Sequence, residues 1–98
     1  MEIKQTKCDN ELVIVLEGRL DTMTAPQLEA ELKGSLEGVQ TLILDLEKLE
    51  YISSAGLRVL LSAQKVMVKQ GEMKLIHVNE TVMEVFEVTG FSDILNIE

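Results

Sequence analysis

Residues 42–57 read LILDLEKLEYISSAGL and pass from a strand into the start of a helix. The apolar core of the first part, Leu42-Ile43-Leu44, predicts a buried strand. Ser53 or Ser54 then predicts a helix N-cap, because a serine hydroxyl accepts a hydrogen bond from the first backbone amides of a helix. We expect this helix to end at Gln70-Gly71, where glycine would supply a left-handed terminal conformation.

The chain before this segment predicts a hairpin followed by a helix. Residues 3–8 alternate weakly between apolar and polar side chains, and a turn signal separates them from the continuous apolar run 12–16. Such a run favours a strand covered on both faces. Thr24-Ala25-Pro26-Gln27 fits a capping box, and the leucines at positions 28, 32 and 36 recur on one face of the helix that it opens.

The remaining chain completes an alternating pattern of strands and helices. Residues 73–78 predict a strand, Asn79 caps a third helix that ends at Gly90, and residues 94–97 form a last short strand or strap. The order is β-β-α-β-α-β-α with a short C-terminal strand. We therefore predict one α/β domain over residues 1–98, a sandwich with a mixed sheet of four or five strands and helices on at least one face.

Composition excludes several classes of function. The 98 residues hold 9 Lys and Arg against 17 Asp and Glu, a net charge of −8, and only three aromatic side chains. This composition argues against nucleic-acid binding. The chain lacks the apolar stretch of a signal peptide and any run near the roughly 20 residues that span a bilayer, so we expect a cytoplasmic protein without membrane insertion. A monomer is the default expectation at this size and charge.

Two hydroxyls, on Ser53 and Ser54, lie at the predicted N-terminus of the second helix. A phosphate there would be stabilised by free backbone amides and by the positive end of the helix dipole. A phosphoserine also adds about −1.5 to −2 of charge, enough to alter a docking face. From position alone, however, a simple helix cap is the favoured interpretation.

The sequence lacks residues that a catalytic or metal-binding site would require. A nucleophile elbow needs glycine two residues on either side of its serine, whereas Ile52 precedes Ser54 at that spacing. The six glycines are scattered and form no phosphate-binding loop. His77 and Cys8 are single and far apart, which offers no ligand spacing. We therefore expect no catalytic residue, no cofactor and no metal.

The second helix also has a second apolar stripe. Val59 and Val66 project roughly opposite to its Leu57-Leu60-Leu61 face, with Ser62 and Ala63 between them. Either another part of the domain covers this stripe or it is an exposed contact patch. The candidate partner-binding residues are Arg58, Val59, Ser62 and Val66.

Four motifs together resemble a known family. They are Gly18-Arg19-Leu20-Asp21, the strand 42–46, Tyr51-Ile52-Ser53-Ser54-Ala55-Gly56-Leu57, and residues 85–91. With the opening hairpin, they resemble bacterial anti-sigma-factor antagonists, the single-domain members of the STAS family, over essentially the whole chain. The serine-containing block before Gly56-Leu57 is the most specific part.

The resemblance implies a phosphorylation-controlled binding switch. In that family the unphosphorylated antagonist sequesters an anti-sigma factor that is also a serine kinase, and a sigma factor is released. Phosphorylation ends the association, and a PP2C-type phosphatase restores it. The resemblance implies that the antagonist itself is no enzyme and needs no cofactor.

Matching the motif residue by residue puts the phosphate acceptor at Ser54, two positions before Gly56-Leu57. Ser53 stands where the best-studied members have an aspartate, which makes it a second candidate acceptor. Ala55 stands where a serine or threonine often occurs, and Asp21 matches an acidic position near the acceptor.

Two rival functions remain. The first keeps the fold and makes the chain a STAS subunit of a transport or stress-signalling complex, in which the serine is only a cap. The second, and the least favoured, is a small serine hydrolase, which would need a base within about 3 Å of the Ser54 hydroxyl.

Overall fold

The structure is a computed structural model that describes all residues from 1 to 98. The predicted α/β class is confirmed, with a five-stranded sheet. The elements in chain order are β1 (Glu2–Cys8), β2 (Glu11–Leu20), α1 (Ala25–Ser35), β3 (Thr41–Asp45), β4 (Leu49–Ile52), α2 (Ser54–Gln70), β5 (Glu72–Ile76), α3 (Glu80–Thr89) and the 3₁₀ turn η1 (Phe91–Asp93). The predicted order omitted β4, because four residues that are buried only at their two ends give no alternating pattern.

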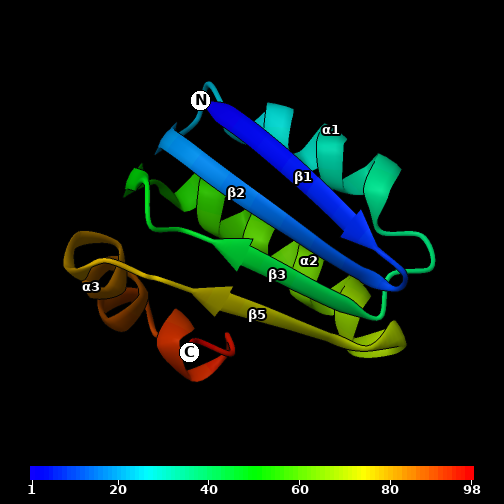
Figure 1. Cartoon of the computed structure of the whole chain (residues 1–98). Helices are drawn as coiled ribbons and strands as arrows, with labels where there is room; N and C mark the ends of the chain where they lie inside the picture. The colour runs from blue at the N-terminus through cyan, green and yellow to red at the C-terminus, as the bar shows by residue number, and fades with distance from the viewer.

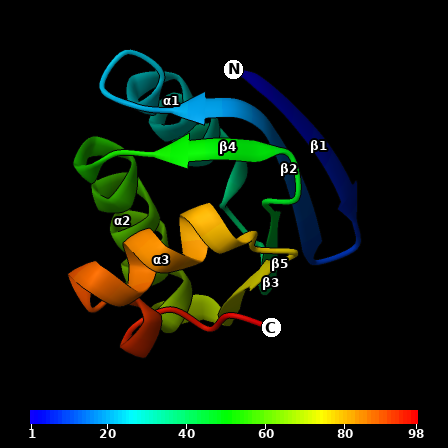
Figure 2. The ribbon, with the colours of Figure 1, turned by 90° about the vertical axis from the view of Figure 1, so that its left-hand side faces the viewer.

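The sheet is mixed, and its second strand is shared between two neighbours. β1 lies antiparallel to β2, whereas β3 and β5 continue the sheet in parallel. The pairing with β3 ends at Val15, and from Gly18 to Leu20 β2 pairs with β4 instead, with an irregularity between Gly18 and Arg19. Gly18 has φ +103°, a left-handed conformation that favours glycine. Figure 2 shows β4 beside the end of β2, above α2 and α3 in that view.

Helices α1 and α2 pack on one face of the sheet, and the opposite face has no helix on it (Figure 1). The core between sheet and helices contains 24 buried hydrophobic residues and no buried polar one. On β2, Leu12, Ile14 and Leu16 are buried, while Val13 and Val15 are half-buried. The prediction that both faces of this strand are covered is therefore wrong. The apolar run reflects a central strand whose outer valines are shielded only by neighbouring side chains.

The predicted apolar face of α1 is confirmed, but its predicted cap is wrong. Leu28, Leu32 and Leu36 are all buried. Thr24 makes no side-chain cap, because its hydroxyl donates to the carbonyl of Arg19 at 2.7 Å. The Asp21 carboxylate instead accepts from the amide of the N-cap residue itself, Thr24, at 3.2 Å.

Helix α2 has the predicted bounds, although two details differ. Gly71 has φ 172°, which is extended rather than left-handed. Glycine is required there because a Cβ would lie 1.8 Å from the carbonyl oxygen of Gln40. Val59, expected opposite to the Leu57-Leu60-Leu61 face, is buried. Packing of α1 against α2 turns the buried face toward Val59.

The C-terminal part follows the prediction closely. The Asn79 side chain caps α3 by accepting from the Val82 amide, and Gly90 ends it with φ +81°. Residues 94–97 form a strap that touches the sheet through one parallel bridge between Leu75 and Ile97. None of the helices combines the length and the apolar composition that crossing a membrane requires.

Candidate functional site

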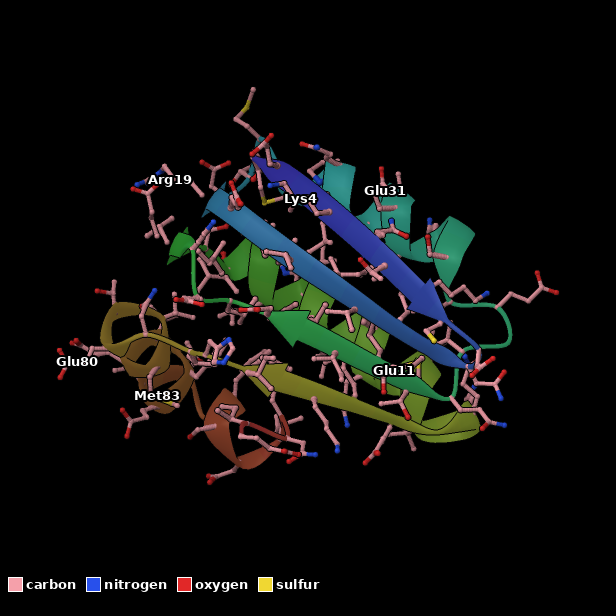
Figure 3. The ribbon with its side chains drawn as sticks, in the orientation of Figure 1. Lys4, Glu11, Arg19, Glu31, Glu80 and Met83 are labelled. Carbon is pink, nitrogen blue, oxygen red and sulfur yellow. The ribbon has the colours of Figure 1, made fainter.

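Strands β2 and β4 bring the two halves of the candidate site together. Their last paired residues are Leu20 and Ile52, and the Ser53 amide donates to the Leu20 carbonyl at 2.9 Å. Asp21 and Ser53 are the next residues of the two strands, so they leave the sheet side by side. Figure 3 shows the side chain of Arg19, a residue of β2, at the same end of the molecule.

The two serines at the start of α2 are in different situations. Ser53 is the N-cap, and its hydroxyl accepts from the Gly56 amide at 3.4 Å. Ser54 is the first helical residue, its side chain is exposed, and its hydroxyl has no hydrogen-bonding partner. Helix geometry leaves the amides of Ser54 and Ala55 without intrahelical partners. The free hydroxyl therefore lies at the positive end of the helix dipole.

Gly56 allows the first turn of α2 to rest on the sheet. A Cβ on this residue would lie 2.7 Å from Cγ of Leu20 and 2.9 Å from Cγ1 of Ile52. Leu57, the next residue, is buried in the core, and Ala55 packs against its edge. The role of Ala55, Gly56 and Leu57 is thus to fix the position of the serines by packing. None of the three has a polar side chain.

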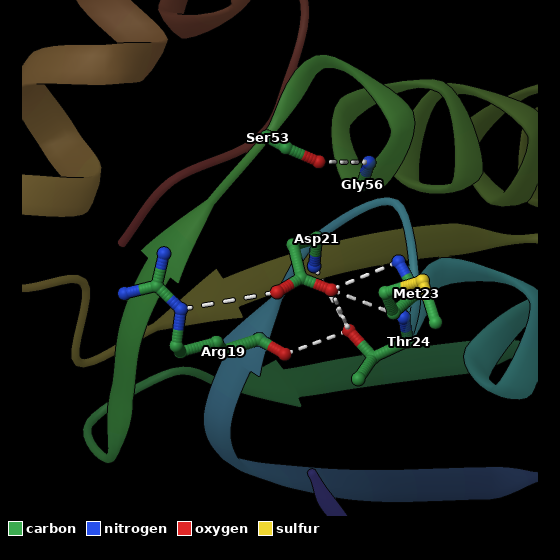
Figure 4. Close-up of polar contacts among 6 residues, drawn as sticks. All are labelled: Arg19, Asp21, Met23, Thr24, Ser53 and Gly56. Atoms are coloured by element: carbon green, nitrogen blue, oxygen red, sulfur yellow. Dashed lines mark hydrogen bonds and ion pairs between the residues drawn. The ribbon is translucent and has the colours of Figure 1, made fainter.

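Asp21 organises the loop that faces the serines. Its Oδ1 accepts hydrogen bonds from the Met23 amide at 3.0 Å and from the Thr24 amide at 3.2 Å (Figure 4). Desolvation alone would raise the pKa of the Asp21 carboxyl. Hydrogen bonds from Thr24 and Met23 and the charge of Arg19 outweigh it, so the pKa lies below its ordinary 3.8. A fixed negative charge therefore stands beside the start of α2 at neutral pH.

Arg19 and Tyr51 lie next to the Asp21 loop and belong to the candidate site, although sequence reasoning did not single them out. The Arg19 guanidinium lies 4.3 Å from the centroid of the Tyr51 ring, and its Nε lies 3.8 Å from Oδ2 of Asp21. Met23, in the same loop, is 86% exposed. The spacing of Arg19 and Asp21 at i and i+2 was the available signal, because such residues share one side of a strand.

The predicted partner-binding residues divide into two groups. Arg58 and Ser62 are exposed and Val66 is 42% exposed, whereas Val59 is only 4% exposed. The exposure predicted for Val59 is therefore wrong, because α1 covers this part of the stripe. What remains is a groove of about 540 Å³ between α1 and α2, with Leu32, Val59 and Val66 among its lining residues. A binding role for Arg58, Ser62 and Val66 stays a prediction.

The only histidine of the chain is engaged elsewhere. Nδ1 of His77 lies 3.1 Å from Oδ1 of Asp45 and 3.8 Å from Oε2 of Glu47. No hydrogen bond joins Ser54 to this imidazole. Sequence reasoning missed the cluster because 32 residues separate Asp45 from His77, and only the pairing of β3 with β5 brings them together.

Comparison with known proteins shows the family to which this chain belongs. The model of the STAS domain matches residues 2–98, and the chain belongs to this family. It is 42% identical to BtrV of Bordetella bronchiseptica, named as a candidate anti-sigma factor antagonist, over 99% of this chain and 85% of that protein. It is 31% identical to the anti-sigma-B factor antagonist of Bacillus subtilis, over 99% of this chain and 88% of that protein.

Solved structures share the fold at lower identity. The anti-sigma factor antagonist SpoIIAA in its unphosphorylated form is similar with a TM-score of 0.76 and 21% identity, over 99% of this chain and 87% of that one. An anti-sigma factor antagonist from Mycobacterium paratuberculosis gives a TM-score of 0.88 at 21% identity, over 98% of this chain and 83% of that one. The five-stranded sheet with its covering helices is thus the fold of these antagonists.

Proposed function

We propose that this protein is an anti-sigma factor antagonist whose binding is switched off by phosphorylation of Ser54. Relatives named as anti-sigma factor antagonists at 42% and 31% identity support the first part. The similar protein SpoIIAA is known in both an unphosphorylated and a phosphorylated form. In this account the unmodified chain binds an anti-sigma factor and frees a sigma factor.

One observation supports Ser54 over Ser53 as the acceptor. The Ser53 hydroxyl is occupied as the cap of α2, while the Ser54 hydroxyl is exposed and unpaired. Transfer of a phosphoryl group to Ser53 would cost the cap hydrogen bond, whereas transfer to Ser54 breaks no interaction. Ser54 is therefore the acceptor that an external kinase can reach without disturbing the helix.

The effect of the phosphate follows from its surroundings. It would add about −1.5 to −2 of charge next to the ionised Asp21 on a chain of net charge −8. Free amides at the start of α2 would tolerate the added group, so the fold need not change. A partner that docks on this surface would meet a bulky dianion instead of a hydroxyl, and binding would be lost through charge and sterics.

The chain acts in this scheme as substrate and ligand. Ser54 has no base within hydrogen-bonding distance, and His77 contacts Asp45 and Glu47 instead, which argues against the serine hydrolase. A partner anti-sigma factor with serine kinase activity would supply ATP, Mg²⁺ and the catalytic groups. A PP2C-type phosphatase would reverse the reaction, and all three proteins would meet in the cytoplasm.

Equilibrium binding to the anti-sigma factor of the same organism tests the proposal. Ser54→Ala should bind as the unmodified protein does, because no interaction is removed. Ser54→Glu should bind at least about tenfold more weakly, since a like charge or an unmatched desolvated charge in an interface costs several kcal/mol.

Thr81→Glu is the matched control. Thr81 is an exposed hydroxyl residue in the first turn of α3, so this variant adds the same charge at another helix start. It should bind within a factor of about two of the unmodified protein. Equal weakening by Thr81→Glu and Ser54→Glu would attribute the effect to total charge and refute a local switch.

A further inference from the structure

Three side chains with metal-ligating atoms converge at the carboxyl ends of β3 and β5. Asp45 ends β3, Glu47 lies in the turn to β4, and His77 follows β5. The register pairs Asp45 with Ile76, which makes Asp45 and His77 spatial neighbours. These residues come from two backbone segments that are far apart in the sequence and include an imidazole, so they are more than a run of surface carboxylates.

Backbone contacts fix the segments that carry the three side chains. The Leu46 amide donates to the Ile76 carbonyl at 3.0 Å and ties the end of β3 to the end of β5. Oδ1 of Asp45 accepts from the Glu47 amide at 3.1 Å, which holds the turn against the strand. Part of the cost of ordering a ligand set is therefore already met by the fold.

The separations between the donor atoms fit one small ion. Nδ1 of His77 is 3.1 Å from Oδ1 of Asp45 and 3.8 Å from Oε2 of Glu47, and the three ligand atoms lie within 4.8 Å of one another. Ligands at about 2.0–2.2 Å from a tetrahedral zinc ion are separated by about 3.3 Å. Glu47 is 69% exposed and can rotate to close the remaining gap.

The charge of the cluster is also unbalanced. No lysine or arginine forms an ion pair with Asp45 or Glu47, and the adjacent Lys48 pairs with Glu17 at 3.5 Å. Two carboxylates therefore share a small volume with an imidazole as their only side-chain partner. A divalent cation would neutralise them, and the exposed side of the cluster leaves room for water as further ligands.

We propose that Asp45, Glu47 and His77 form a binding site for a divalent first-row transition-metal ion such as Zn²⁺ or Ni²⁺. The mixed nitrogen and oxygen donors favour such ions over Mg²⁺, which prefers oxygen ligands in an octahedral arrangement. The ion links the β3–β4 turn to the segment after β5. It stabilises the folded chain, because an ion that binds only the native state shifts the unfolding equilibrium.

Calorimetric titration of Zn²⁺ into the full chain tests this site, with Cys8→Ser as background to remove the only thiol. We expect one ion per chain and an increase in the unfolding temperature. Mg²⁺ at the same concentration should produce neither. Amide NMR resonances of residues 45–47 and 77 should shift selectively.

His77→Asn is the informative variant, because asparagine tolerates the left-handed backbone of His77, φ +56°. It should lower Zn²⁺ affinity by at least about tenfold, since even the loss of an outer-shell partner costs ~10–100-fold. Glu11→Gln removes an exposed carboxylate at the start of β2 and should leave affinity unchanged. The site would be refuted if His77→Asn bound Zn²⁺ as tightly as the background protein does. It would also be refuted if binding were not stoichiometric, or if the amide shifts were spread over residues near many different carboxylates.

Discussion

Ser53 and Ser54 are adjacent and chemically identical, yet the fold gives them different environments. Ser53 retains an extended backbone and turns its hydroxyl toward the Gly56 amide, whereas Ser54 is already helical and its hydroxyl is unpaired. The division matters because an N-cap hydrogen bond and a phosphate acceptor make conflicting demands on one oxygen. In the proposed switch, two consecutive serines would divide these roles, with Ser53 as the cap and Ser54 as the acceptor.

This division predicts unequal effects on stability. Ser53→Ala should lower the free energy of unfolding by about 0.5–2 kcal/mol, the usual cost of deleting a serine N-cap. Ser54→Ala should change it by less than about 0.5 kcal/mol, because no contact is lost and alanine is a better helix former. Urea denaturation of the two variants, monitored by circular dichroism, measures both. A larger loss for Ser54→Ala would show that the cap has been assigned to the wrong serine.

At the scale of elements, the site exists because two strand ends and one helix start approach closely. β2 pairs with β3 only as far as Val15, and its last residues, from Gly18 onward, pair with β4. Gly56 then lets the first turn of α2 contact the side chains of Leu20 and Ile52. The loop of Asp21 and the serines are thereby held together by backbone geometry rather than by a direct bond between them.

Gly56→Ala tests this close approach. The new methyl group would meet Leu20 and Ile52 at 2.7 and 2.9 Å, and such overpacking costs about 1–3 kcal/mol of unfolding free energy. Gly34→Ala, in the last turns of α1, is the matched control because nothing lies within 4 Å of its added Cβ. It should stabilise the chain by about 0.5–1 kcal/mol through helix propensity. If both variants behaved alike in thermal unfolding, the tight contact under α2 would be refuted.

At the scale of the whole molecule, local signals predicted much of the fold. Apolar periodicity located the buried leucines of α1, and Asn79 and Gly90 marked the ends of α3. These signals are reliable because each depends on residues a few positions apart. Motif matching placed Ser54 at the start of a helix for the same reason, and the structure adds its exposure and free hydroxyl.

Features that depend on distant contacts were not predictable in this way. The burial of Val59 depends on how α1 crosses α2, and the open outer face of β2 depends on where both helices lie. Thr24 does not cap α1, because its hydroxyl donates to the carbonyl of Arg19 at the end of β2. The cluster of Asp45 and His77 exists only through the pairing of β3 with β5.

Mapping the phosphate after kinase treatment tests the central claim most directly. The protein, Ser53→Ala and Ser54→Ala are each incubated with Mg-ATP and the anti-sigma factor of the same organism, the proposed kinase, and the product peptides are sequenced by mass spectrometry. The account predicts a single phosphate on Ser54 in the unmodified protein and in Ser53→Ala, and none in Ser54→Ala. Phosphate on Ser53, or an unlabelled protein beside a kinase that phosphorylates another antagonist, would contradict it.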